Sequence, residues 1–270
     1  FGPKTPLGKR RTIFADAPEH DLAMLEESFV EREPVTVVIS DKGWIRTLKG
    51  HVADLGNLTF KTDDKLGQSF FAETTSKLLL LATNGRFYSL DVAKLPGGRG
   101  HGEPIRLFID MEQDAAIVAL FVHTGGRKFL VASHDGQGFI VNEDDCVGTT
   151  RKGKQVLNVE MPNEAKTLCV VGAGHDQVAV IGTNHKMIVF PLDQVPEMAR
   201  GRGVRLQKYT SASLSDITTF AAKDGLSWKD GAGREQRLSW KELADWRGNR
   251  ADAGRLATGL PKSNKFGKGM

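Results

Sequence analysis

The chain has 270 residues, of which 40% are hydrophobic, enough to fill one large domain or two small ones. Thirty glycines and only 7% aromatic residues indicate many tight turns and exclude a fold made mainly of long helices. No apolar stretch approaches the roughly 18 residues of a membrane span, so we expect a protein that requires no membrane. Cys146 and Cys169 lie among apolar residues, which predicts buried thiols in a reducing cytoplasm.

The first 33 residues differ in character from the rest. The segment 1–11 is basic and contains glycine and proline, whereas 16–33 is acidic, with apolar residues at roughly helical spacing. This pattern ends at Pro34, which cannot continue a helix. We therefore expect a linker or short helix over 1–33.

After Pro34 a repeated pattern predicts β-hairpins. Five segments consist of an apolar run, a polar turn and a second apolar run, and they begin at Val35, Leu78, Lys128, Gln177 and Asp216. The turns, taken at Gly43, Gly85, Gly136, His185 and Gly225, lie 42, 51, 49 and 40 residues apart. This period is the size of one blade in propeller-like folds, so the sequence predicts an all-β disc of about five blades. At the fourth turn we expect Asn184 to adopt the left-handed conformation, because His185 replaces glycine.

Glycine-rich basic loops recur between the hairpins. They cover 97–100, 151–154, 200–203 and, more loosely, 247–250. Glycine lets backbone N–H groups approach a phosphate closely, and the interleaved Arg and Lys release counterions from a duplex. Residues 199–270 hold 15 Lys and Arg against 7 Asp and Glu, so we expect the C-terminal half to anchor a polyanion.

The sequence lacks the common signatures of catalysis. No phosphate-binding GxxxxGK[ST] loop, HExxH, CxxC or EF-hand pattern occurs, and the seven histidines are scattered. We therefore predict no catalytic residue, no metal site and no cofactor. Tyr209 follows Arg205 and Lys208 as a cation-primed nucleophile would, but a tyrosine in a strand or loop is far commoner.

Three stretches carry a family resemblance: EPVTVVISDKGWIRTLKGH (33–51), LPGGRGHGEP (95–104) and MIVFPLDQVPEMARGRG (187–203). They resemble the C-terminal domain of the A subunit of bacterial topoisomerase IV, which is related to the DNA-wrapping domain of gyrase A. The resemblance implies a β-pinwheel over 34–259, built of about five four-stranded blades that exchange strands with their neighbours. It also implies that 1–33 joins this domain to a cleavage core and that 260–270 is a flexible basic tail.

The resemblance further implies a non-catalytic module that binds and bends double-stranded DNA on its basic outer rim, for relaxation or decatenation. ATP and Mg would be used elsewhere in the parent type II topoisomerase. Its other partners would be the B subunit of topoisomerase IV and another copy of the A subunit, contacted through an N-terminal part, in the bacterial cytoplasm at the nucleoid. Two alternatives stay open: gyrase-type wrapping for negative supercoiling, and a protein-interaction β-propeller. No intact copy of the gyrase box Gln-Arg-Arg-Gly-Gly-Lys-Gly occurs, which favours topoisomerase IV.

The candidate phosphate contacts are basic residues just after the turns or in the glycine-rich loops. We expect only some of them to contact DNA, because long basic side chains are often merely solvated. The predicted set is Arg46, Arg86, Arg99, Arg106, Arg151, Lys152, Lys154, Lys186, Arg200, Arg202, Arg205 and Lys208.

Overall fold

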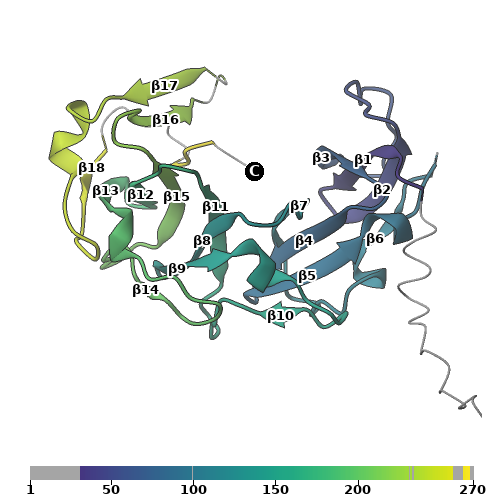
Figure 1. The fold of residues 1–270 in the computed structure, drawn as a ribbon, viewed down its shortest axis with the longest axis horizontal. Coiled ribbons are helices and arrows are strands. Elements are labelled where there is room, and N and C mark those ends of the chain that lie inside the picture. Colours follow the sequence, from purple (N-terminus) through teal and green to yellow (C-terminus); the bar gives the residue numbers. More distant parts are fainter. Residues whose placement is uncertain (1–30, 99, 231, 233, 258–263, 268–270) are drawn as a thin grey trace, which may run out of the picture.

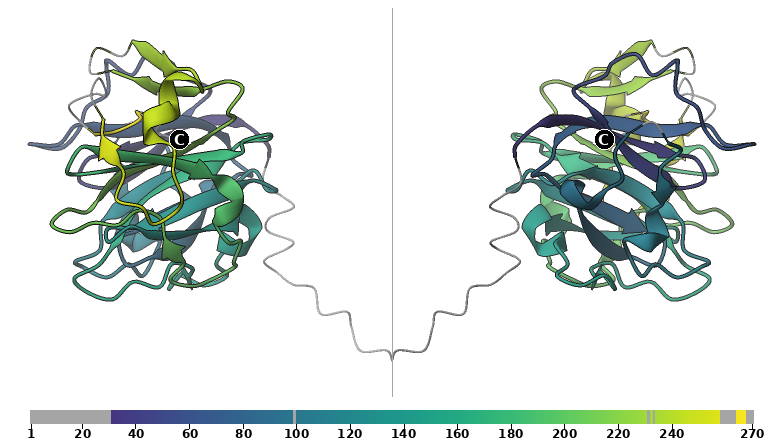
Figure 2. Two further views of the ribbon diagram at one scale, coloured as in Figure 1. Left: turned by 90° about the vertical axis from the view of Figure 1, so that its left-hand side faces the viewer. Right: turned by 90° about the vertical axis from the view of Figure 1, so that its right-hand side faces the viewer.

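The computed structural model describes residues 31–98, 100–230, 232, 234–257 and 264–267. Within these residues the strands form four four-stranded antiparallel sheets and one two-stranded sheet, which confirms the predicted all-β class. Figure 1 shows the sheets following one another around an arc, with the first and the fifth at its two ends. The side views in Figure 2 look at the arc from these two ends.

Each of the first four sheets is built on a predicted hairpin. The hairpin strands are β1 (Pro34–Ser40) and β2 (Trp44–Lys49), β4 (Lys77–Ala82) and β5 (Arg86–Asp91), β8 (Lys128–Ser133) and β9 (Gln137–Asn142), and β12 (Gln177–Gly182) and β13 (Lys186–Pro191). The first three turns contain Gly43, Gly85 and Gly136, with φ of 81°, 74° and 81°. In the fourth turn the left-handed residue is His185, with φ of 58°, and not Asn184 as expected. The Asn184 side chain instead accepts a hydrogen bond from the backbone N–H of Lys186 at 3.1 Å.

An inner strand pairs with the first strand of each hairpin. The inner strands are β3 (Leu66–Glu73), β7 (Ile117–Val122), β11 (Ala165–Val171) and β15 (Leu214–Phe220). In Figure 1 they line the concave side of the arc. Together with Lys265 and Gly267 they border a central space of about 470 Å³.

An outer strand pairs with the second strand of each hairpin and comes from further along the chain. The outer strands are β6 (Glu103–Pro104), β10 (Lys154–Gln155), β14 (Val204–Arg205) and β18 (Arg255–Leu256). The chain completes the hairpin β4–β5 of the second sheet before β6 returns to β2 in the first sheet, and the same order recurs three times. The predicted strand exchange between neighbouring blades is therefore present.

The fifth sheet contains β16 (Leu226–Lys229) and β17 (Glu235–Leu238). The predicted hairpin over 216–231 is wrong, because its first apolar run belongs to β15, which pairs with β12 in the fourth sheet. β16 and β17 are joined instead near Asp230 and Arg234, where the N–H of Asp230 donates to the carbonyl of Arg234 at 2.9 Å. The residues around Gly225, with φ of 73°, connect two sheets.

Of the predicted flexible tail the structure describes residues 264–267, in which Asn264 and Phe266 are buried and Lys265 and Gly267 are exposed. Phe266 is 1% exposed and lies in the core of the fifth sheet. Its carbonyl accepts a hydrogen bond from the N–H of Lys229 at 3.2 Å, and its own N–H donates to the carboxylate of Asp216 at 2.9 Å. This segment follows β18 as β15 follows β14, so it takes the place of the inner strand of the fifth sheet.

The hydrophobic core is divided into clusters that lie between successive sheets. In β4, Leu78 and Leu80 pack in the cluster shared with the first sheet, whereas Leu79 and Leu81 pack in the cluster shared with the third. Side chains alternate between the two faces of a strand, so a strand buried on both faces is apolar throughout. This explains the run of four leucines. Short 3-10 helices follow several strands: η1 (Val92–Lys94), η2 (Ile105–Leu107), η3 (Glu143–Cys146), η4 (Leu192–Gln194) and η5 (Glu242–Trp246).

Candidate nucleic-acid interface

The outer strands form the convex perimeter of the arc (Figure 1), and each begins directly after a glycine with positive φ. These glycines are Gly102, Gly153, Gly203 and Gly254, with φ of 84°, 66°, 80° and 73°. A Cβ atom at any of them would lie 2.3–2.6 Å from a carbonyl oxygen of the neighbouring hairpin strand, closer than real Cβ atoms approach. The sequence analysis assigned a role at phosphates to the glycines of four loops, which include Gly153 and Gly203 but neither Gly102 nor Gly254. All four glycines before the outer strands are required by the fold, because they let the outer strand close onto its sheet.

Three of the four outer strands carry an exposed cation. They are Lys154 in β10, Arg205 in β14 and Arg255 in β18. Within the described residues, neither Lys154 nor Arg205 forms a salt bridge. Arg255 lies 3.7 Å from Asp245, but the two side chains are 73% and 82% exposed, so this pair is weak. These three side chains can therefore contact phosphates without breaking a strong internal interaction.

Further exposed cations lie next to the outer strands. Lys152 precedes β10, Lys208 follows β14, and Lys186 in β13 is directly paired with Leu256 of β18. No carboxylate among the described residues pairs with any of these three lysines. The structure thus brings these predicted lysines to the same perimeter as the outer strands.

Four of the predicted arginines are exposed or half-buried, but each already has a hydrogen-bond or ion-pair partner within the fold. Arg151 donates to the carbonyl of Leu107 at 2.5 Å, and its guanidinium lies 3.4 Å from Asp110. The other three are Arg202, 3.6 Å from Asp135, Arg200, which donates to Asn158 at 3.2 Å, and Arg86, which donates to the carbonyl of Lys152 at 3.3 Å. A phosphate would have to compete with these partners.

Arg46 and Arg106 have structural roles, although both were predicted as phosphate contacts. Arg46 is 3% exposed, and its guanidinium donates to the carbonyls of Gly100 and Thr59. Arg106 donates to four carbonyls of the segment 111–115 and so holds that loop together. Because their donors are used inside the fold, we leave both out of the candidate interface. Arg99, another predicted contact, lies outside the described residues.

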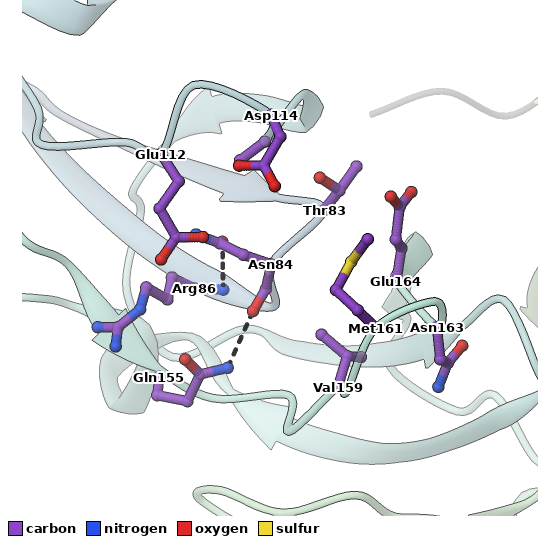
Figure 3. Close-up of a pocket in the computed structure, with 11 residues that line it drawn as sticks. Thr83, Asn84, Arg86, Glu112, Asp114, Gln155, Val159, Met161, Asn163 and Glu164 are labelled. Atoms are coloured by element: carbon purple, nitrogen blue, oxygen red, sulfur yellow. Dashed lines mark hydrogen bonds between the residues drawn. The ribbon is translucent and has the colours of Figure 1, made fainter.

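A pocket of about 220 Å³ lies beside the turn between β4 and β5 (Figure 3). Its lining includes Arg86, but also the carboxylates of Glu112, Asp114 and Glu164. Figure 3 shows Glu112 next to Arg86, Asp114 at the top of the view and Glu164 to the right, near Met161. This concentration of negative charge is unfavourable for a phosphate. We therefore place the candidate interface on the exposed cations of the outer strands and not in this pocket.

Sequence reasoning missed Arg255 as a member of this interface. The signal was available, since Gly254 precedes Arg255 just as Gly153 precedes Lys154. The loop over 247–250 was recognised only loosely, and its Arg247 stacks on the ring of Trp240 at 4.4 Å. Nearby Arg250 donates to the carbonyl of Arg205 at 2.9 Å and so links two successive loops.

This arrangement of sheets and outer strands is similar to that of known proteins. The model of the DNA gyrase C-terminal domain, beta-propeller, matches residues 76–124, 127–166 and 176–212, which contain the second, third and fourth hairpins. The E. coli ParC C-terminal domain superposes with a TM-score of 0.74 and 26% identity, over 85% of this chain and 96% of that one. The chain belongs to the gyrase A C-terminal domain family.

The relatives of this chain include A subunits of DNA topoisomerase 4. The A subunit of DNA topoisomerase 4 from Caulobacter vibrioides is 45% identical over 257 residues, which are 95% of this chain and 33% of that protein. The protein of the same name from Rickettsia bellii is 36% identical over 98% of this chain and 36% of its own length. The chain thus spans about a third of the length of these relatives and has the β-pinwheel fold of the ParC C-terminal domain.

The structure also bears on metal binding, membrane insertion and the two thiols. The part of the chain that the structure describes holds no group of three or more His, Cys, Asp or Glu side chains suited to a metal ion. Nor does it contain a helix that is long and apolar enough to cross a membrane. The predicted burial of both cysteines is confirmed, and burial raises the pKa of the Cys146 thiol to about 12.

Tyr209 has a packing role in this pinwheel. It is half-buried, its hydroxyl donates to the side chain of Gln207 at 3.1 Å, and its ring lies against Gly136 and Gly182. Burial raises the pKa of Tyr209 above its ordinary value, which disfavours the phenolate that a nucleophile needs. We expect Tyr209→Phe to leave the affinity for duplex DNA within about twofold, because the one lost hydrogen bond is internal to the fold and its removal, which costs roughly 1 kcal/mol of stability, removes no contact with DNA. Fluorescence anisotropy with labelled duplex measures this, and a tenfold loss of affinity would contradict it.

Proposed function

We propose that this pinwheel is the DNA-binding and DNA-bending module of a topoisomerase IV A protein. In this proposal the duplex backbone follows the convex perimeter formed by the outer strands, and the parent enzyme uses the bound segment for relaxation or decatenation. The observation that carries the proposal is the recurrence of exposed cations on β10, β14 and β18, in a chain of the gyrase A C-terminal domain family.

The contacts would be with phosphates and would read little base sequence. Cations on short outer strands at nearly even intervals match a polyanionic backbone, which has the same charge at every step. Smooth bending of 20–30 base pairs costs on the order of 1–6 kcal/mol, which several phosphate contacts can offset. We therefore expect binding that depends on DNA length and curvature.

The remaining parts of the reaction belong to the rest of the parent protein. We propose that strand cleavage, ATP and Mg reside outside this chain, in a complex that contains two A subunits together with the B subunits. The parent enzyme would act at the nucleoid, in the bacterial cytoplasm. Relatives about three times as long as this chain support a module that works as part of a larger enzyme.

Neutralising the three outer-strand cations tests the proposal. The variant Lys154→Gln, Arg205→Gln, Arg255→Gln is expected to bind a long linear duplex roughly 100-fold more weakly at 0.1 M salt. Loss of three phosphate contacts should reduce the slope of log K against log salt by about 2.7. Gel-shift titrations at several salt concentrations measure both quantities.

The matched control removes the same charge elsewhere. The variant Lys49→Gln, Lys77→Gln, Lys128→Gln changes three cations that are paired with Glu33, Asp91 and Glu197 at strand ends away from the outer strands. It should bind DNA within a few-fold of the unchanged chain, since only its net charge differs. Equal losses in both variants, or binding that is insensitive to salt in the unchanged chain, would refute the proposal. Salt-insensitive capture of a protein would favour the propeller alternative, and chirally wrapped ligation products would favour the gyrase-type alternative.

A further inference from the structure

Four residues hold equivalent positions at the start of the outer strands. Strand pairing places Glu103 opposite Ile45, Lys154 opposite Phe87, Val204 opposite Gly138 and Arg255 opposite Met187. In every case the opposing residue is the second residue of its hairpin strand, and a left-handed glycine comes immediately before the outer strand. The same backbone arrangement thus presents a carboxylate on the first sheet and cations on the second and fourth. On the third sheet the cation is the adjoining Arg205.

The first sheet also differs in how its outer side is covered. The segment 51–65 folds back over β2, where the carbonyl of Thr59 accepts a hydrogen bond from Arg46 at 3.0 Å. The ammonium group of Lys61 lies 3.5 Å from the centre of the Trp44 ring, so this cation is engaged with its own sheet. The exposed charge that β6 itself contributes is therefore the carboxylate of Glu103.

At the boundary with the second sheet the neighbouring cation is partly neutralised. Arg151 lies 3.4 Å from Asp110 and donates to the carbonyl of Leu107, which closely follows β6. Two unit charges of the same sign about 4 Å apart repel by roughly 1–4 kcal/mol near a protein surface. A phosphate moving along the perimeter from β10 would thus meet a paired arginine and then the Glu103 carboxylate, which forms no salt bridge with any of the described residues.

We infer that Glu103 ends the DNA-binding arc, so that the duplex follows the second, third and fourth sheets and leaves the disc before the first. The inference rests on the proposed function and deepens it, because it defines the length of DNA that one module engages. The outer strand of the first sheet thereby limits bending to part of the perimeter.

Reversing this charge tests the inference. Glu103→Lys is expected to bind long duplexes roughly five- to tenfold more tightly at 0.1 M salt and to steepen the salt slope by about one, which corresponds to one added phosphate contact. Short duplexes that fill only the remaining arc should bind as before, and the footprint on long DNA should lengthen. Glu103→Gln, which removes the repulsion without adding a cation, should give a smaller gain in the same direction.

The control is Asp114→Lys, an equal change of charge in the acidic pocket beside the turn between β4 and β5. It should raise affinity for short and long duplexes alike and leave the footprint unchanged. Identical behaviour of Glu103→Lys and Asp114→Lys, or an unaltered footprint in Glu103→Lys, overturns the inference. If the unchanged chain shows no salt-sensitive binding, the proposed function fails as well. If it binds and the outer-strand triple variant weakens binding, an unaltered footprint refutes only the role of Glu103.

Discussion

Phe266→Ala is expected to lower the free energy of unfolding by about 3–5 kcal/mol, the usual cost of truncating a fully buried phenylalanine. The ring lies in a cluster with Leu226, Trp228 and Leu243, and it is 1% exposed. The cavity left by the ring would weaken the attachment of the segment 264–267 to β16. We expect the fifth sheet to loosen first, because it has only two strands and this segment to hold it.

Urea unfolding followed by tryptophan fluorescence measures this loss, since Trp228 and Trp240 belong to the fifth sheet and its surroundings. The matched control is Lys265→Ala, the neighbouring exposed residue, which should change stability by less than about 0.5 kcal/mol. Equal unfolding midpoints for the two variants would show that the segment is not an integral part of the sheet.

Glu143→Ala is expected to cost about 3 kcal/mol at neutral pH. The side chain of Glu143 is 0% exposed and accepts hydrogen bonds from Arg127 Nε and Nη2 at 2.9 and 2.6 Å and from the N–H of Thr124 at 3.1 Å. Removing the carboxylate leaves the guanidinium, itself only 30% exposed, without its countercharge. It also leaves a backbone donor unsatisfied.

This effect should depend on pH in a defined direction. Burial alone would raise the pKa of Glu143, but the hydrogen bonds and charge of Arg127 and the Thr124 N–H outweigh it and lower the pKa below its ordinary value. A carboxylate with a lowered pKa stabilises the fold above the unfolded pKa of about 4.3, and this stabilisation is lost as pH falls below that value. The difference in unfolding free energy between Glu143→Ala and the unchanged chain should therefore shrink below about pH 4.

The exposed pair of Lys128 and Glu197, at 2.6 Å, provides the control. Glu197→Ala should cost less than about 1 kcal/mol, because both side chains are nearly half-exposed to solvent. A pH-independent difference for Glu143→Ala, or a loss no larger than that of Glu197→Ala, would contradict the argument.

The hairpins of the first four sheets could be predicted because the relevant information is local. An apolar run, a turn with a left-handed residue and a second apolar run determine a hairpin within about 15 residues. The same reasoning failed for the fifth, where Asp224 and Gly225 form a genuine turn between two apolar runs. The sequence does not reveal that β15 pairs with β12, about 35 residues earlier, so the turn joins two different sheets.

The candidate interface was predicted only in outline for a similar reason. Arg46 and Arg205 both lie near glycines in basic surroundings, yet the first is buried and the second is exposed. Whether a guanidinium donates to backbone carbonyls depends on how the loops pack, and charge patterning does not contain that information. Likewise, Gly153 and Gly203, which precede two of the outer strands, were assigned to phosphates, because their close contact with the neighbouring sheet arises only in three dimensions.

The exchange of outer strands has a consequence for synthesis on the ribosome. When β9 has emerged, the second sheet still lacks β10 and the third still lacks β11 and β14, so two sheets are unfinished at once. Each growing sheet therefore keeps an open edge until the next hairpin and its following loop have been translated. A nascent chain released early at such a point would leave both blades incomplete together, and its open edges would be targets for chaperones or proteases.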